Sequence, residues 1–131
     1  MTLVDTNVLL DVLVEGAAHG DESEERLAAA LQRGPVLVND VIAAELAPLF
    51  DRDEDLWRTL ASAQVRLAPY PRDAIYAAGQ GFLRYRRTGG KRQRILPDFL
   101  IGAHALVAGA SLLTRDRGFY RSHFPKLRLA G

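Results

Sequence analysis

The chain of 131 residues contains no cysteine, and this absence excludes several kinds of chemistry at once. Disulfide frameworks, zinc sites built on thiolates and cysteine nucleophiles are all ruled out. Histidine is scarce as well, because the three residues His19, His104 and His123 include no pair at a spacing typical of metal ligands. Any ion held by this chain is therefore expected to be bound by oxygen atoms.

Long hydrophobic runs are also missing. No apolar stretch approaches the roughly 18 residues that a membrane span needs. We find no basic segment followed by an apolar stretch and a small-residue cleavage site, which is the pattern of an export signal. We therefore expect a cytoplasmic protein with no membrane partner, and the length predicts one domain over residues 1–131.

Lysine is nearly absent: 15 of the 17 basic residues are arginine, a bias that GC-rich coding alone can produce. The net charge of +1 hides an uneven distribution, because six basic residues fall in RYRRTGGKRQR, residues 84 to 94. A local positive field of this kind attracts polyanions. The alternative is an ordinary solvated loop.

Short apolar runs alternate with longer helical patterns along the chain. The expected strands are residues 3–4, 35–39, 65–68, 110–114 and 126–129. The expected helices are residues 8–13, 21–33, 40 to a kink or end at Pro48, 53–64, 72–87 and 98–109. Strands separated by helices predict an α/β fold with a small parallel sheet of four to five strands and right-handed crossovers.

Carboxylates follow two of these strands. Asp5 comes directly after the first strand, in LVDTNVLLD, and Asp116 follows the fourth strand, in LLTRD. Ligands of parallel sheets bind beyond the carboxyl ends of the strands. Each aspartate has a structural alternative, because Asp is a favoured helix cap. Thr6 and Asn7 could cap the first helix equally well, which weakens that alternative for Asp5.

Two further carboxylates stand at unusual places. A helical wheel of VIAAELAPLF places Glu45 in the apolar arc near Ile42, where a glutamate is rare unless it is paired or bound to metal. A side chain that reaches the surface is the alternative. Asp98 follows Pro97 at the start of an apolar, buried helix, which it could simply cap.

The four carboxylates are expected to meet at one edge of the sheet. Their mutual repulsion would raise some of their pKa values unless a cation neutralised them. Oxygen ligands select a hard ion, Mg²⁺ or Mn²⁺, and such ions bind phosphates. The pattern therefore points to metal-dependent phosphodiester chemistry.

LVDTNVLLD, AEL, PDFLIGAHAL and LLTRD, taken in this order along the whole chain, resemble the PIN-domain ribonucleases. The resemblance is greatest to the toxin component of bacterial VapBC-type toxin and antitoxin pairs. It implies a PIN-like fold with helices on both faces of the sheet, RNA as substrate, a VapB-type antitoxin as partner, and a homodimer. It also implies Mg²⁺ or Mn²⁺ as cofactor.

The resemblance assigns roles to individual residues. Asp5, Glu45, Asp98 and Asp116 match the catalytic acidic set, and Asp5, Asp98 and Asp116 would hold the metal. Thr6, Asn7 and Thr114 match accessory polar positions. Capping of the strand-to-helix turns is an equally good interpretation of Thr6 and Thr114.

RNA has to lie across the acidic edge in this interpretation. The candidates for contact with it are Arg84, Tyr85, Arg86, Arg87, Lys91, Arg92, Arg94 and Arg115. Tyr85 would supply a ring on which an unpaired base can stack. His104 lies on the apolar helix without an identifiable acid-base partner, and we expect it to be a hydrogen-bonded core histidine.

Two other interpretations remain open. A phosphatase on a related sheet would use the aspartate after the first strand as nucleophile, but it commonly needs a second aspartate where this chain has Asn7. It also needs a lysine, and Lys91 and Lys126 are poorly placed. A non-catalytic PIN-like binding module would be expected to have lost some carboxylates, yet all four positions are filled.

Overall fold

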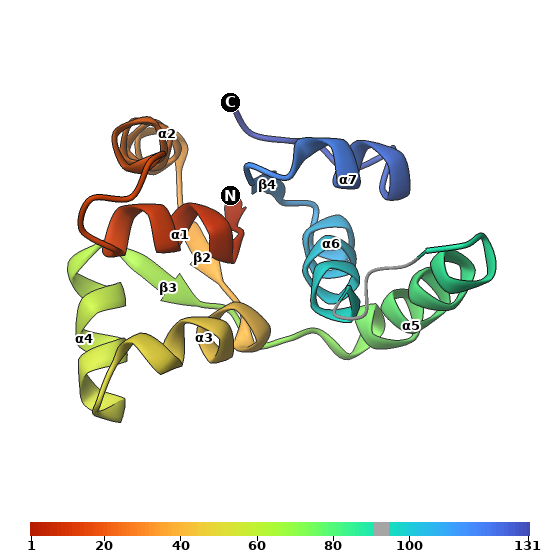
Figure 1. The fold of residues 1–131 in the computed structure, drawn as a ribbon, viewed down its shortest axis with the longest axis horizontal. Coiled ribbons are helices and arrows are strands. Elements are labelled where there is room, and N and C mark those ends of the chain that lie inside the picture. Colours follow the sequence, from red (N-terminus) through yellow and green to blue (C-terminus); the bar gives the residue numbers. More distant parts are fainter. Residues whose placement is uncertain (91–94) are drawn as a thin grey trace.

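The computed structural model describes residues 1–90 and 95–131, and a four-stranded parallel sheet forms its centre (Figure 1). The strands are β1 (Thr2–Val4), β2 (Val36–Val38), β3 (Val65–Leu67) and β4 (Ser111–Leu113). Their spatial order is β3-β2-β1-β4, with Leu3 of β1 opposite both Leu37 and Leu112. The prediction of a small parallel α/β sheet is confirmed.

Helices cover both faces of this sheet, as the family resemblance implied. The helical elements are α1 (Thr6–Leu13), α2 (Gly20–Arg33), α3 (Asp40–Leu46), the short 3-10 helix η1 (Ala47–Leu49), α4 (Asp53–Ser62), α5 (Arg72–Arg87), α6 (Leu96–Ala108) and α7 (Arg117–His123). Figure 1 shows α1, α2 and α4 on one side of the sheet and α5 and α6 on the other. This arrangement follows from right-handed crossovers in a sheet whose strand order reverses once.

Local sequence explains where several elements begin and end. The side chain of Asn39 caps α3 by accepting a hydrogen bond from the Ile42 amide at 2.9 Å. At Pro48 the α-helical pattern gives way to η1. Gly109 ends α6 in the left-handed conformation, with φ of 67°. Gly81 allows α5 to pack closely on α6, because a β-carbon there would lie 2.9 Å from the Phe99 ring.

The C-terminal part differs from the prediction in three respects. Residues 117–123 form the helix α7, where only a short turn was expected. The predicted strand 126–129 is reduced to one parallel bridge between Leu129 and Leu112, because a turn from Phe124 to Leu127 uses up most of this segment. Leu96 in the first turn of α6 and Leu106 and Val107 in its last turn are exposed, so the predicted burial of this helix holds only for its middle, from Phe99 to Ala105.

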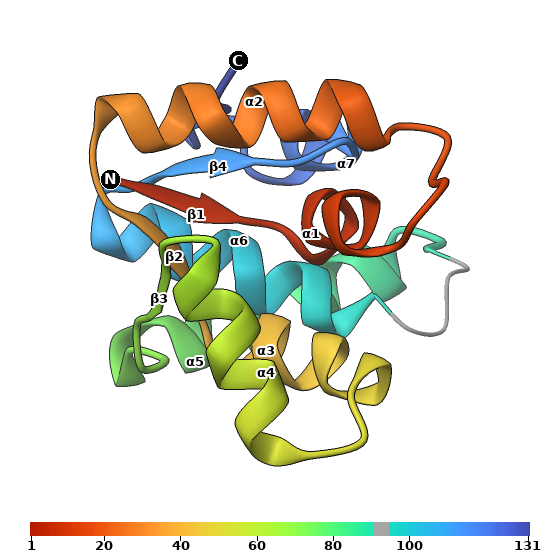
Figure 2. The same ribbon diagram turned by 90° about the vertical axis from the view of Figure 1, so that its left-hand side faces the viewer.

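The carboxyl ends of the strands define one edge of the molecule. Figure 2 shows that β1 and β4 point toward α1 and α7, and that the first turn of α6 lies on the same side. Within the described ranges, none of the helices has both the length and the apolar character needed to cross a bilayer.

Candidate active site

Asp5 is the buried centre of the carboxyl edge, where β1 passes into α1. Only 4% of the residue is exposed, and its Oδ1 accepts a hydrogen bond from the Thr6 amide at 2.8 Å. Its Oδ2 accepts from the Thr114 hydroxyl at 2.8 Å and from Nδ2 of Asn7 at 3.3 Å. Asp5 therefore caps α1, as the structural interpretation held, and still presents a buried carboxylate to the site.

The environment of Asp5 disfavours its negative charge. Burial raises the pKa of its carboxyl, and the hydrogen bonds from Thr114 and Thr6 offset only part of that effect. The nearby charge of Glu45 raises the pKa further. A positive ion at this position would remove both penalties.

The three accessory polar residues form one network around Asp5. Thr114 is fully buried, donates to Asp5, and accepts from Nδ2 of Asn7 at 3.3 Å and from the Asp116 amide at 3.0 Å. The hydroxyl of Thr6 donates to Oε1 of Glu45 at 2.7 Å. These contacts tie the ends of β1 and β4 to α3.

Glu45 does not lie where the helical wheel placed it. The residue is exposed, whereas its neighbours Ile42 and Leu46 are fully buried. The prediction of a glutamate within the apolar arc is therefore wrong, because the short helix α3 turns Glu45 outward. Its carboxylate nevertheless bends back to the edge of the sheet through the hydrogen bond from Thr6.

Asp98 and Asp116 come to the same edge from two other elements. Asp98 lies in the first turn of α6 and Asp116 precedes α7, and both are half-buried. Within the residues that the structure describes, the Asp116 side chain makes no capping hydrogen bond to α7. The capping alternative for Asp116 is therefore not what the structure shows.

Tyr120 lies within the electrostatic influence of three of these carboxylates, and sequence reasoning missed it. Its side chain is completely buried, and burial raises its pKa, as do the negative charges of Asp5, Asp98 and Asp116. Its hydroxyl approaches Asp5 closely enough to lower the pKa of that carboxyl, but it forms no well-aligned hydrogen bond within the described residues. The only signal in the sequence is its position one helical turn after Asp116.

The donor set fits a hard divalent cation by its chemistry. Carboxylate and hydroxyl oxygens surround a buried carboxylate whose charge is otherwise disfavoured. Across residues 1–90 and 95–131, however, no three Asp, Glu or His side chains are gathered closely enough to form a ready-made ion site. Carboxylates that repel one another are expected to draw together only around a positive charge.

The basic residues predicted to contact RNA fall into three groups. Arg84, Arg86 and Arg87 are exposed at the end of α5, which Figure 2 shows on the same side of the molecule as the carboxyl ends of β1 and β4. Lys91, Arg92 and Arg94 lie outside the described residues. Arg115 makes a two-pronged contact with Asp11, through Nε to Oδ2 at 2.5 Å and Nη2 to Oδ1 at 3.0 Å.

The rings of Tyr85 and His104 both pack against other side chains of the protein. Tyr85 is half-buried and packs against Phe99 and His123, with ring centroids 5.8 Å and 5.2 Å apart, so its placement favours packing over base stacking. His104 is buried, and its Nδ1 lies 3.0 Å from Nδ2 of Asn39. Burial lowers the pKa of His104, and the prediction of a hydrogen-bonded core histidine is confirmed.

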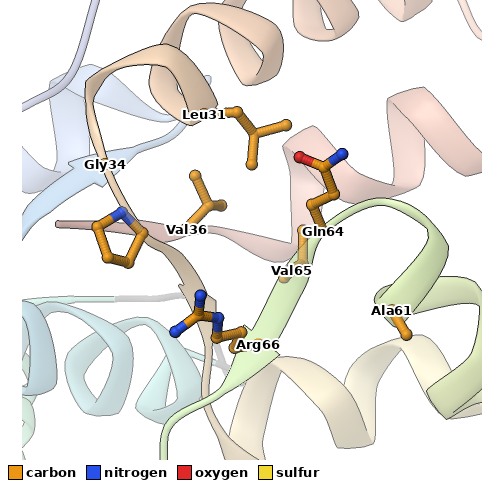
Figure 3. A pocket seen from close by; sticks show the side chains of 8 residues that line it. Leu31, Gly34, Val36, Ala61, Gln64, Val65 and Arg66 are labelled. Carbon is orange, nitrogen blue, oxygen red and sulfur yellow. The ribbon is translucent and has the colours of Figure 1, made fainter.

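A hollow of about 690 Å³ lies between α2, α4 and the starts of β2 and β3 (Figure 3). Leu31, Gln64 and Arg66 are among the side chains that line it. None of the lining residues is a carboxylate, and the hollow lies at the amino edge of the sheet. The acidic site is therefore not this pocket.

The fold and the site together define an α/β domain with an acidic centre at the carboxyl edge of a parallel sheet. A family model of the PIN domain matches residues 2–124, and the chain belongs to the PIN domain family. No curated protein sequence matches the chain.

Solved structures of similar fold span nearly the whole chain. VapBC2 from Rickettsia felis, bound to a DNA fragment from its promoter, aligns with a TM-score of 0.73 and 19% identity, over 98% of this chain and 96% of that one. VapBC-1 from nontypeable Haemophilus influenzae aligns with a TM-score of 0.72 and 17% identity, over 98% of this chain and 95% of that one. FitAcB from Neisseria gonorrhoeae aligns with a TM-score of 0.62 and 21% identity, over 100% of this chain and 97% of that one.

Proposed function

We propose that this chain is a metal-dependent endoribonuclease that acts as the toxin of a toxin and antitoxin pair. The observation that carries the proposal is the buried carboxylate of Asp5. Together with Asp98 and Asp116, it lies close enough to the buried phenol of Tyr120 to raise the pKa of that phenol. Membership of the PIN domain family and the likeness in fold to VapBC complexes support the same assignment.

The chain's own residues explain how the site would act on a phosphodiester. Asp5, Asp98 and Asp116 would hold Mg²⁺ or Mn²⁺, which supplies the positive charge that activates water and stabilises the leaving oxygen. Asn7 and Thr114 fix the orientation of Asp5 through its Oδ2. Glu45 is exposed and held by Thr6, so it is the carboxylate best placed to accept a proton from incoming water.

The geometry argues against the phosphatase alternative. A nucleophilic aspartate needs an accessible oxygen, whereas Asp5 is 4% exposed and both its oxygens accept hydrogen bonds. Asn7 stands where a second aspartate would be needed, and its amide is engaged with Asp5 and Thr114. A metal site with Asp5 as an inner ligand accounts for these contacts better.

The partners are proposed on the same basis. A small antitoxin is expected because the similar structures are VapBC complexes, and an arginine placed among the carboxylates could replace the charge of the metal. A homodimer is supported by exposed apolar side chains on α5 and α6, among them Ile75, Tyr76 and Val107. Excess antitoxin should therefore prevent both Mn²⁺ binding and cleavage, and a complex that still admits Mn²⁺ would refute this mode of inhibition.

The test is cleavage of a single-stranded RNA by the purified protein in Mg²⁺, in Mn²⁺ and in EDTA. We expect products in either metal, none in EDTA, and none with Asp98→Asn. The same samples are offered para-nitrophenyl phosphate, whose hydrolysis would favour the phosphatase. Binding of Mn²⁺ without cleavage of structured or unstructured RNA would leave the non-catalytic module as the correct interpretation.

A further inference from the structure

Arg115 is engaged with another part of the protein, and this raises the question of what it does. Its guanidinium lies against the carboxylate of Asp11 in α1, with contacts of 2.5 Å and 3.0 Å. Asp11 is 7% exposed, and its Oδ2 also accepts a hydrogen bond from the Ser23 hydroxyl of α2 at 2.7 Å. Three elements thus meet at one buried carboxylate.

The backbone of Arg115 is fastened on the other side to the site itself. Its amide donates to Oδ1 of Asn7 at 3.0 Å, and Nδ2 of the same Asn7 reaches Asp5 and Thr114. Arg115 stands between Thr114, which donates to Asp5, and Asp116, whose amide donates to Thr114. The segment 114–116 is therefore held by its backbone to the site and by one side chain to α1.

The electrostatics of the pair favour a permanent contact. Burial opposes the charge on Asp11, but the hydrogen bonds from Arg115 and Ser23 outweigh burial and lower the pKa of its carboxyl. The hydrogen bond to Asp11 raises the pKa of Arg115. Two parallel charge-assisted bonds to a buried partner fix geometry far better than an exposed ion pair does.

We propose that Asp11, Arg115 and Ser23 are positioning residues that hold the segment 114–116 against α1, and thereby set how tightly the acidic edge binds a divalent cation. The inference rests on the proposed metal-dependent function. It assigns Arg115 to the support of the site instead of to the RNA.

The mechanism is one of fixed orientation. Asp116 follows Arg115 directly, so a shift of the Arg115 backbone would move Asp116 relative to Asp5. The side-chain amide of Asn7 accepts a hydrogen bond from the Arg115 backbone, and without that bond only its contacts of 3.3 Å with Asp5 and Thr114 orient it. Groups that orient metal ligands in this way typically contribute a factor of about 10 to 100 in metal affinity.

The experiment measures Mn²⁺ affinity by calorimetry, with no RNA present. The variants are Asp11→Asn, Arg115→Lys and the double variant. Arg115→Lys keeps the charge and loses the two-pronged contact. We expect each single variant to bind Mn²⁺ about 10-fold more weakly. The double variant should be no weaker than the weaker single one, because both changes break the same contact.

Two controls separate positioning from charge and from stability. The exposed pair Arg52 and Glu54, with side chains 69% and 58% exposed, supplies the matched substitutions Arg52→Lys and Glu54→Gln, which should leave Mn²⁺ affinity unchanged. Val65→Ala, a change of the one buried residue of the edge strand β3, should lower the melting temperature without weakening Mn²⁺ binding. If Asp11→Asn fails to fold, Arg115→Lys and the milder Ser23→Ala carry the test.

Wild-type affinity for Mn²⁺ in both Asp11→Asn and Arg115→Lys would overturn the inference. Weaker RNA binding by Arg115→Lys with normal Mn²⁺ affinity would show instead that Arg115 contacts RNA. If the wild type itself binds no Mn²⁺, the proposed function fails and this inference fails with it. If the wild type binds Mn²⁺ and all variants bind it equally well, only the inference fails.

Discussion

Asp5 illustrates how one side chain can satisfy both a structural and a functional requirement. Its Oδ1 caps α1, while its Oδ2 faces Thr114 and Asn7 at the centre of the site. An aspartate that served only as a cap would normally be exposed, yet Asp5 is buried and its pKa is raised by that burial. The charge of Asp5 is thus a cost in the metal-free fold that a cation would offset.

Replacing Asp5 by asparagine should stabilise the metal-free protein. The Asp5→Asn side chain can still cap the Thr6 amide, and the change removes a buried charge that lies near Glu45. Thr114 and Asn7 lose the oxygen that accepted their hydrogen bonds, which offsets only part of that gain. We therefore expect the free energy of unfolding to rise by on the order of 1 kcal/mol. Urea unfolding in EDTA measures it. The exposed Asp51→Asn serves as control and should change little.

In excess Mg²⁺ the wild type should be more stable than Asp5→Asn, the reverse of the order expected in EDTA. Binding to the folded state alone stabilises the wild type, and Asp5→Asn should gain little from the same Mg²⁺. Equal stabilisation of both proteins by Mg²⁺ would mean that the ion binds elsewhere.

His104 should make stability depend on pH. Burial depresses its pKa below the usual 6.5, so the folded state takes up a proton less readily than the unfolded state. The contribution of His104 to the free energy of unfolding is fully present above pH 6.5. It is lost as the pH falls through the lower pKa that His104 has in the folded state. Urea unfolding at pH values of about 7.5 and about 5.5, on either side of the usual histidine pKa, should show this loss for the wild type.

The matched variant is His104→Gln, which should lose less stability on acidification. Leaving buried Asn39 with a poorer partner should cost about 1–3 kcal/mol near neutral pH. His19→Gln, at an exposed position, should behave like the wild type. An identical pH dependence in wild type and His104→Gln would exclude His104 as the source.

At the scale of helices and strands, hydrophobic periodicity and helix caps in the sequence predicted most of the elements of the fold. The strands at 3–4, 35–39, 65–68 and 110–114 were predictable because short apolar runs stand between helix signals. The stretch 126–129 has a similar pattern, but the turn at Phe124 leaves it a single pairing. Long-range geometry of that kind leaves no local signal in the sequence.

The site shows the same division between local and long-range information. The placement of Asp5, Asp98 and Asp116 at the carboxyl edge could be predicted because each stands at the end of a strand or the start of a helix, whereas their role as metal ligands stays a prediction. Glu45 was misplaced because a wheel drawn on a short helix cannot fix which side of α3 meets the core. Asp11 and Tyr120 were missed because their partners Arg115 and Asp5 lie at the opposite end of the chain.

One element boundary contains a strained residue. Gln64 joins α4 to β3 with φ of 61°, a left-handed conformation that favours glycine. Gln64→Gly should therefore raise the free energy of unfolding by about 1 kcal/mol. Ala61→Gly, inside α4, should lower it by a similar amount, about 1 kcal/mol. A destabilised Gln64→Gly variant, measured by urea unfolding, would show that the Gln64 side chain makes a compensating contact.

On the scale of the whole molecule, positive charge gathers beside the acidic edge. Arg84, Arg86 and Arg87 are exposed at the end of α5, on the side where the strands end (Figure 2). RNA that reaches the carboxylates would pass these arginines, although the net charge of the chain is only +1. Affinity for RNA should then depend on salt through a few local contacts.

Replacing Arg86 and Arg87 by glutamine should flatten that salt dependence. Each lost phosphate contact lowers the slope of log K against log salt by roughly 0.7 for a single strand, so the double variant should lose about 1.4. Binding is measured in Ca²⁺ to suppress cleavage. The control replaces two exposed arginines of the α4 region, Arg52 and Arg58, and should keep the wild-type slope. An unchanged slope in the double variant of Arg86 and Arg87 would indicate that this segment is ordinary solvated surface and does not contact RNA.

The central claim is that Asp5, Asp98 and Asp116 hold the divalent ion on which RNA cleavage depends. Its most direct test is the cleavage rate of one single-stranded RNA, measured across a Mn²⁺ titration for the wild type, Asp5→Asn and Asp116→Asn. We expect a saturable rise for the wild type. Both variants should fold, but their cleavage rates should be lower than that of the wild type by more than about a hundredfold. That loss exceeds the usual effect of removing a residue that only supports a metal ligand. A folded Asp5→Asn or Asp116→Asn variant that cleaves RNA at the wild-type rate would contradict the claim.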